Sequence, residues 1–308
     1  MTSMNTQTFA ERIAANDLPP GSYELRFEDF SVTLPVALLA RGDNATICYG
    51  FHGAIDQTKR ALPVFYGAGL FQDLATPPTF ISIADPSLRL SAETLFTWYA
   101  GDHAFPTQRA IRALVEAVQA AAKPSKTIFV GGSSGGHPTL LHSHAVPGSI
   151  CLTVNPLASI KTYPTNLARY EALCWPSGSP LYEDDVFERY AAGYDNHVIV
   201  LQNAFDNHLQ RQGWPLVHAL SHHPGSLVLT EFFSDYVGHK YPAQPLQAWF
   251  RAALSVAQPD LEKIAHLANP AAKPAEPAPP AAKSSRSFPD AKIQLADRIA
   301  ADLKGARA

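Results

Sequence analysis

The chain has 308 residues, of which 46% are hydrophobic and 17% charged, and its formal net charge is −3. A chain of this size and composition can bury one full core with extensions, and its charge argues against a nucleic-acid partner or an anionic membrane surface. It contains no apolar run long enough to span a bilayer, and residues 1–8 lack the basic and apolar parts of a secretory signal. We therefore expect a cytoplasmic protein.

Alternating strand and helix patterns run through most of the chain. An antiparallel opening is expected over residues 22–40, where apolar and polar side chains alternate. After it, short β-rich runs bounded by Gly and Pro alternate with segments of helical apolar spacing. The expected strands lie at 44–51, 79–84, 127–130, 149–155, 198–203 and 226–233, and the clearest helix lies at 108–122. This order predicts an α/β fold, in which a mostly parallel sheet carries helices on both faces.

The segment at about 157–197 has no strand pattern but contains seven aromatic residues. We predict a small helical cap inserted into the α/β domain. The aromatic side chains with polar tips, Tyr163 among them, could contact a substrate or could form the core of the cap itself.

The most informative motif follows the apolar run at 127–130. It is the sequence Gly132-Ser133-Ser134-Gly135-Gly136, whose Gly-x-Ser-x-Gly spacing is typical of a sharp turn between a strand and a helix. Flanking glycines let the strand and the helix approach closely, and the turn presents its central serine. We expect Ser134 to be a nucleophile; the alternative is a glycine-rich turn without chemistry.

A serine nucleophile requires a histidine base and a carboxylate that orients it. Asp206 follows the strand at 198–203, and His239 lies on a loop after the strand at 226–233. Catalytic groups gather at the carboxyl ends of strands in open α/β sheets, which favours Asp206 over the other candidate acid, Asp235.

The order Ser134, Asp206, His239 and the Gly-x-Ser-x-Gly turn resemble those of the α/β-hydrolase superfamily. The resemblance covers about residues 22–256. It implies the α/β-hydrolase fold and a serine hydrolase or esterase that works through an acyl-enzyme.

The resemblance also implies an oxyanion hole. A strand that ends in His52-Gly53-Ala54 is similar to the oxyanion loop of the family, so the backbone N–H of Gly53 or Ala54 would act together with that of Gly135. A single glycine follows His52, where many esterases have two or three, which leaves open which N–H donates.

Two histidines near these residues are candidates for contact with substrate. His52 could bind substrate or serve the structure, and His208, two residues after Asp206, could contact substrate or lie in a solvated loop.

The two ends of the chain differ in composition from the middle. We expect an N-terminal extension over 1–21, the hydrolase domain over 22–256, a Pro/Ala-rich linker over 257–288 and an amphipathic helix over 289–308. That helix could dock on its own domain, on a sister subunit in a homo-oligomer, or on another protein.

The expected function is an esterase acting on a small-molecule or glycan ester. An acyltransferase that moves an acyl group to or from a glycan is the alternative, because the first half-reaction is common to both. Residues 132–136, with Pro147-Gly148-Ser149 and Asn155-Pro156 behind them, also resemble hydrolase-fold proteins of bacterial surface-polysaccharide or glycoconjugate pathways. A third possibility is a non-catalytic hydrolase-fold partner protein.

We expect no cofactor and no metal, since Cys48, Cys151 and Cys174 are widely spaced without a Cys-x-x-Cys pair.

Overall fold

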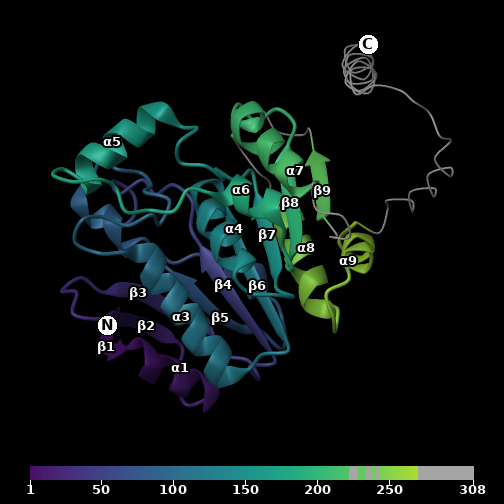
Figure 1. Cartoon of the computed structure of the whole chain (residues 1–308). Helices are drawn as coiled ribbons and strands as arrows, with labels where there is room; N and C mark the ends of the chain where they lie inside the picture. The colour runs from purple at the N-terminus through teal and green to yellow at the C-terminus, as the bar shows by residue number, and fades with distance from the viewer. Residues whose placement is uncertain (222–227, 234–237, 240–242, 270–308) are drawn as a thin grey trace, which may run out of the picture. The chain divides into compact units, whose positions relative to one another are not determined.

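The computed structural model describes residues 1–221, 228–233, 238–239 and 243–269 (Figure 1). In these residues a nine-stranded sheet runs through the domain in the order β1-β2-β3-β5-β4-β6-β7-β8-β9. The strands are β1 (Thr2–Asn5), β2 (Gly21–Arg26), β3 (Leu34–Ala40), β4 (Thr46–Phe51), β5 (Thr79–Ile83), β6 (Lys126–Gly132), β7 (Ile150–Val154), β8 (His197–Asn203) and β9 (Val228–Phe233).

The sheet is mostly parallel, as predicted. β3 runs antiparallel to both β2 and β5, whereas every other neighbouring pair is parallel. All residues of β6 and β7 are buried, which is the pattern of parallel strands covered on both faces.

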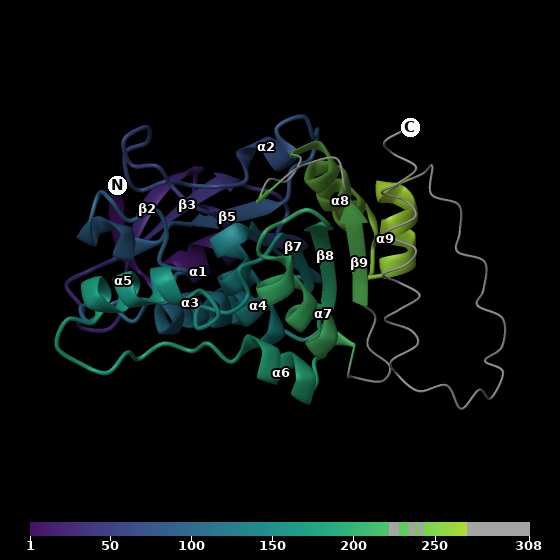
Figure 2. The same cartoon turned by 90° about the horizontal axis from the view of Figure 1, so that it is seen from above.

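Helices cover both faces of the sheet, which confirms the predicted fold class (Figure 2). On one face lie α1 (Thr6–Ala14), α3 (Thr107–Ala122), α4 (Gly136–His144), α6 (Val186–Ala192) and α7 (Trp214–Leu220). On the other face lie α2 (Ala68–Phe71), α8 (Ala243–Ser255) and α9 (Leu261–Ala268). Alternate strand side chains supply the two cores: Tyr49 and Phe129 pack toward the α1–α3 side, and Cys48 and Ile128 pack toward α8.

The parallel strands place their carboxyl ends at one edge of the sheet. The register pairs Phe51 of β4 with Gly131 of β6 and pairs Val154 of β7 with Leu201 of β8. Segments that leave β4, β6, β8 and β9 therefore start side by side, although they are far apart in the sequence.

The N-terminal residues belong to this domain, which corrects the predicted extension over 1–21. β1 pairs with β2 in parallel, and Phe9 and Ile13 of α1 are buried in the core shared with α3. Asn5 starts α1 as its cap, because its side chain accepts a hydrogen bond from the backbone N–H of Thr8 at 2.7 Å.

The segment predicted as a cap contains two helices with different neighbours. α5 (Pro164–Cys174) packs through Tyr170 and Cys174 against Trp98, away from the sheet. α6 instead buries Val186 and Tyr190 against α4 and α7, in the core of the sheet. Only the first half of the insertion therefore stands apart as a cap.

The predicted linker over 257–288 begins too early. α9 occupies 261–268, where Leu261 and Ile264 are buried against α8. Asp260 caps this helix by accepting the N–H of Lys263 at 2.9 Å. The remaining linker from residue 270 and the expected helix at 289–308 lie outside the described residues.

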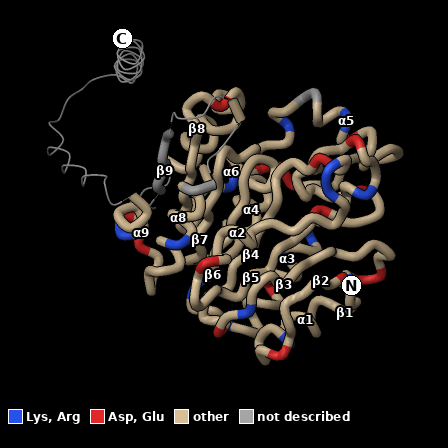
Figure 3. The backbone as a smooth tube through the Cα atoms, turned by 180° about the vertical axis from the view of Figure 1, so that it is seen from behind, with Lys and Arg blue, Asp and Glu red and all other residues tan. Residues whose placement is uncertain are grey.

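Charged residues of both signs are intermingled along the described backbone (Figure 3). One network joins Glu183 to Arg112 at 2.8 Å and also to Arg189. None of the described helices combines the length and apolar character needed to cross a bilayer.

Buried His142 on α4 makes the fold sensitive to acid. Its Nε2 has no hydrogen-bond partner among the described residues, and burial, followed by nearby positive charges, lowers its pKa from 6.5 to about 3. Between these pH values the histidine is protonated in the unfolded chain but not in the folded chain. The free energy of unfolding therefore falls as the pH drops from about 6.5 toward 3, by about 1.4 kcal/mol per pH unit.

We expect His142→Phe to remove this contribution. In urea denaturation at pH 7, 6 and 5, the variant should lose less stability than the wild type, and the difference should approach about 1.4 kcal/mol per pH unit at the acidic end of this range. The same change at exposed His266 on α9 controls for loss of a histidine. Equal pH slopes for the wild type and His142→Phe would contradict the assignment.

Candidate active site

A strained turn joins β6 to α4, and Ser133 occupies its corner. β6 ends at Gly132, which is extended, and Ser133 follows with φ of 55°, in the left-handed region that favours glycine. A 3₁₀ turn over Ser133–Gly135 then leads directly into α4. Such a turn projects the side chain of its corner residue beyond the sheet edge.

The structure places a different serine at the corner of the turn from the one that the sequence predicted. The serine at the corner is Ser133, whereas Ser134 lies one residue into the turn and is 1% exposed. The six residues 131–136 read Gly-Gly-Ser-Ser-Gly-Gly, so two overlapping Gly-x-Ser-x-Gly frames exist. The frame that the structure uses is 131–135, because β6 extends through Gly132.

Two glycines of that frame permit close backbone approach. A Cβ at Gly131 would lie 2.5 Å from the carbonyl oxygen of Gly135. A Cβ at Gly135 would lie 2.6 Å from the carbonyl oxygen of His52 and 2.7 Å from that of Phe51. The absence of a side chain at Gly131 therefore lets the turn close on itself, and its absence at Gly135 lets the turn pack against the end of β4.

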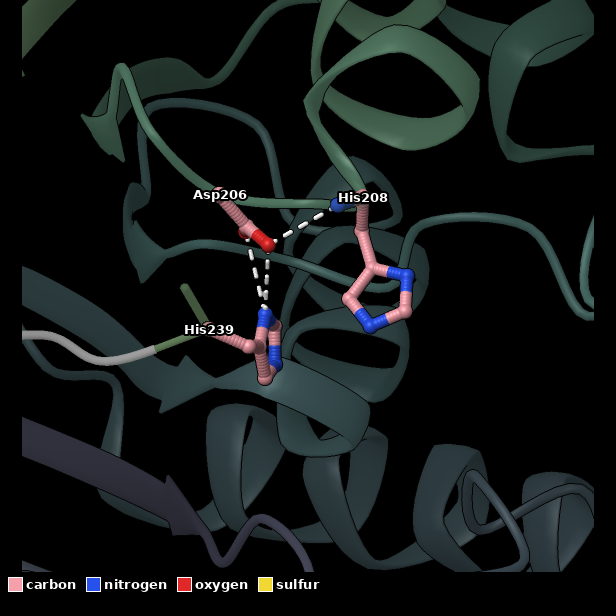
Figure 4. A group of neighbouring side chains, drawn as sticks. All are labelled: Asp206, His208 and His239. Carbon is pink, nitrogen blue, oxygen red and sulfur yellow. Dashed lines mark hydrogen bonds and ion pairs between the residues drawn. The ribbon is translucent and has the colours of Figure 1, made fainter. Parts of the chain in front are cut away.

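Ser133, His239 and Asp206 form a continuous chain of hydrogen bonds. His239 Nε2 lies 2.8 Å from Ser133 Oγ, and His239 Nδ1 lies 3.0 Å from each carboxylate oxygen of Asp206. Figure 4 shows the carboxylate of Asp206 facing the Nδ1 edge of the imidazole. The structure thus brings two of the three predicted catalytic residues together, with Ser133 in place of Ser134.

The electrostatics of Asp206 fix which nitrogen of His239 carries the proton. The Asp206 side chain is 2% exposed, and burial alone would raise its pKa. Hydrogen bonds from His239 and from the backbone N–H of His208 outweigh burial and hold the pKa below its usual value. An ionised carboxylate only accepts, so Nδ1 of His239 donates and Nε2 accepts the hydroxyl proton of Ser133.

Backbone contacts anchor the loop that carries His239. The amide of Asn203, at the end of β8, donates to the carbonyl of Gly238 at 2.8 Å, and the N–H of Gly238 donates to the carbonyl of Phe205 at 3.2 Å. Gly238 has φ of 78°, a conformation that favours glycine. The histidine is therefore fastened to the segment that carries its carboxylate partner.

A buried network of side-chain amides supports the segment that carries Asp206. Asn155, just after β7, accepts hydrogen bonds from the amide of Gln202 at 3.1 Å and from the backbone N–H of Asn203 at 2.7 Å. The amide of Gln202 also lies 3.4 Å from Asp206 Oδ2. These contacts link the ends of β7 and β8.

The predicted oxyanion residues lie in two different positions. Gly53 adjoins the turn, since a Cβ there would lie 3.3 Å from Cβ of Ser133 and 3.9 Å from its Oγ. Ala54 follows it and is exposed. Gly135 serves instead to pack the turn against β4, and the residue after the corner serine is Ser134.

His52 is not available to a substrate, which corrects that expectation. It is 3% exposed, its Nδ1 donates to the carbonyl of Gly53 at 2.8 Å, and its Nε2 accepts the backbone N–H of Asp85 at 3.2 Å. Burial lowers its pKa to about 4, so the ring is neutral and both nitrogens are occupied.

His208 and Tyr163 do lie beside the site. The ring of His208 packs edge-to-face on that of His239, with centroids 4.8 Å apart, and the centroid of the Tyr163 ring lies 4.9 Å from that of His208. Tyr163 Oη is 3.5 Å from His208 Nε2. Burial, then the charge of His239, lowers the pKa of His208, which favours a neutral ring.

Asp206, His208 and His239 also satisfy the spacing of a metal-binding group. Each offers one ligand atom, and these atoms lie within 4.8 Å of one another. Two of the three are already paired by the hydrogen bonds between Asp206 and His239 Nδ1. The arrangement therefore suits the orientation of a proton-accepting imidazole.

Several contributing residues were missed in the sequence. Ser133 could have been found from the second motif frame, and Gly238 from its place directly before His239. Asn155 and Asn203 end strands in the sequence, but no pattern shows that their amides turn toward neighbouring loops. Asp235 lies outside the described residues.

Comparison with known proteins identifies the fold. Neither a model of a protein family nor the sequence of a curated protein matches the chain. The solved structure of the capsule O-acetyltransferase of Neisseria meningitidis serogroup A is similar, with a TM-score of 0.56 and 14% identity over 80% of this chain and 99% of that one.

Two further solved structures are also similar, with slightly lower TM-scores. The fluorophosphonate-binding serine hydrolase F of Staphylococcus aureus has a TM-score of 0.52 at 12% identity, covering 78% of this chain and 99% of that one. The acylaminoacyl peptidase of Pyrococcus horikoshii has a TM-score of 0.52 at 14% identity, covering 81% and 45%. The chain therefore has the α/β-hydrolase fold.

The close approach at Gly135 gives a test of the turn. We expect Gly135→Ala to lower the free energy of unfolding by about 1–3 kcal/mol, because its methyl group would collide with the backbone carbonyl oxygens of Phe51 and His52. Gly69→Ala in α2 is the matched control, since a Cβ there meets nothing within 4 Å. Urea denaturation of both variants provides the measurement, and equal stabilities would refute the packing argument.

Proposed function

We propose that this protein is a serine esterase in which Ser133 is the nucleophile, His239 the base and Asp206 the orienting acid. The observation that carries the proposal is the 2.8 Å contact between His239 Nε2 and Ser133 Oγ, backed by the carboxylate on Nδ1. A serine hydroxyl that donates to an oriented imidazole is the activated nucleophile of acyl-transfer enzymes.

In the first half-reaction, Ser133 Oγ attacks the ester carbonyl carbon while its proton moves to His239 Nε2. The tetrahedral intermediate collapses, and the alcohol leaves with the proton that His239 returns to it. Asp206 stabilises the positive charge that His239 holds between the two proton transfers. An acyl-enzyme on Ser133 remains.

Backbone N–H groups would hold the negative oxygen of the intermediate. The N–H of Ser134, next to the nucleophile, takes the place that the sequence analysis gave to Gly135, and Gly53 or Ala54 supplies the second donor. The closeness of Gly53 to the nucleophile supports this placement, since a Cβ at Gly53 would lie 3.9 Å from Ser133 Oγ. One such donor typically contributes about 2.7–4 kcal/mol to lowering the barrier.

The second half-reaction decides between two outcomes. If His239 takes a proton from water, the water attacks the acyl-enzyme and an esterase results. If a hydroxyl acceptor takes the place of water, the enzyme is an acyltransferase. The likeness to an O-acetyltransferase and the polar surroundings of His208 support the acyltransferase as a second candidate function.

Labelling with a fluorophosphonate probe tests the nucleophile. We expect the wild type and Ser134→Ala to be labelled and Ser133→Ala not to be, because only Ser133 contacts the base. Esterase turnover of Ser133→Ala should fall by about 10⁴-fold or more. Mass spectrometry of the labelled peptide identifies the modified serine.

The same labelling separates the enzyme from the non-catalytic alternative. A folded wild-type chain that takes no label and cleaves no p-nitrophenyl ester would favour a partner protein. Labelling of Ser134 with Ser133→Ala still active would instead restore the nucleophile expected from the sequence.

A second prediction concerns the acid. Asp206→Asn removes the acceptor that keeps the proton on His239 Nδ1, so the wrong tautomer faces Ser133. We expect kcat to fall by about 10⁴-fold in an assay with p-nitrophenyl acetate. Asp235→Asn, at the other acid considered in the sequence, is the matched control. A larger loss from Asp235→Asn than from Asp206→Asn would reverse the assignment.

A further inference from the structure

A polar hollow of about 520 Å³ lies between the start of α5 and the π-helical turn Leu209–Gly213. Its volume falls within the range of about 300–1,000 Å³ that is typical of small-ligand sites. Every residue that lines it carries a polar group in its side chain; Tyr163, Asn166, His208, Gln210 and Gln212 are among them.

The hollow meets the candidate active site at His208. That residue lines the hollow. Its ring also packs on that of the base His239, at 4.8 Å between centroids and an angle of 85° (Figure 4). Tyr163 lines the hollow beside it. His208 therefore connects the hollow to the imidazole that exchanges protons with the alcohol part of an ester.

The lining contains both committed and free polar groups. Gln212 is buried and holds Ser159 and Thr162 through its amide, at 2.8 Å to each. The side chains of Asn166 and Gln210 form no hydrogen bond with other described residues, although both face the hollow. They can offer donors and acceptors to a ligand.

We propose that this hollow binds the polyhydroxylated alcohol part of the substrate, that is, a sugar ring. This inference rests on the proposed function and specifies its substrate class. A sugar presents several hydroxyl groups that pair with amide, imidazole and phenol groups. An alkyl chain in the same place would remove water from these polar groups without replacing its hydrogen bonds, which disfavours its binding.

The position of the hollow assigns it to the leaving alcohol or the acceptor. His239 Nε2 must protonate the leaving oxygen and later deprotonate the attacking hydroxyl. Because His208 joins the hollow to His239, a sugar bound there can extend its ester oxygen toward His239 Nε2. The hollow thus serves ester hydrolysis and transfer to a sugar equally.

Two acetate esters that differ in their alcohol part provide the test. Methyl 6-O-acetyl-glucopyranoside carries hydroxyl groups, and hexyl acetate carries none. We expect the wild type to have a higher kcat/KM for the sugar ester. In Gln210→Leu and in Asn166→Leu, the ratio of the two kcat/KM values should fall about tenfold, the effect of one lost hydrogen bond.

The control is Gln258→Leu, an exposed position near the amino-terminal end of β6, where Lys126 Nζ donates to the carbonyl of Val256 at 2.7 Å. It lies at the end of β6 opposite Ser133 and should leave the ratio unchanged. Because the readout is a ratio, partial loss of folded protein does not affect it. A wild type that prefers hexyl acetate, or ratios within twofold of the wild type in both variants, would overturn the inference.

Failure of the proposed esterase function can be distinguished from failure of the sugar-binding inference. If the wild type cleaves neither these esters nor p-nitrophenyl acetate, the esterase proposal fails, and binding of methyl glucopyranoside by ligand-observed NMR still decides the hollow. Binding by the wild type that is weakened in Gln210→Leu supports the subsite, and no binding by the wild type refutes it.

Discussion

The pairing of a buried carboxylate with one imidazole is the interaction on which the rest of this site depends. Asp206 is almost fully enclosed, and it stays ionised because His239 and a backbone N–H donate to it. Its charge fixes the proton on one nitrogen of His239 and leaves the other free to accept from Ser133. The hydrogen bonds from Asn203 and to Phe205 hold Gly238, and with it His239, at the distance that this pairing requires. Without that tether, the three side chains would be neighbours in the fold but not a connected chain.

The fold could be predicted from the sequence because its signals are local and repeated. Runs such as 127–130 and 198–203 are apolar throughout, and buried parallel strands have this pattern. The ends of the domain were harder to place. The strand at Thr2–Asn5 is short and polar, and it is recognisable only through its pairing with β2. The helix at Leu261–Ala268 lies directly before a proline- and alanine-rich stretch, so composition alone extended the linker over it.

The site was predictable in its chemistry but not in its register. Asp206 and His239 follow strands, and parallel strands bring their ends together, so their approach follows from topology. The choice between Ser133 and Ser134 depends on where β6 stops, which is a matter of one residue. Repeated glycines on both sides of the serine pair removed the usual guide to that boundary. His52 was misplaced for a related reason, since its position beside Gly53 is close to the turn, while its ring faces inward to the backbone of Asp85.

The backbone of Ser133 has a consequence for how this chain tolerates change. A non-glycine residue in the left-handed region costs about 1–3 kcal/mol, and the packing of β4, β6 and α4 must supply it. Glycine at this position would remove the backbone strain and raise the free energy of unfolding. It would also remove the hydroxyl group that donates to His239. At position 133, the stability of the fold therefore favours glycine, whereas reactivity requires serine.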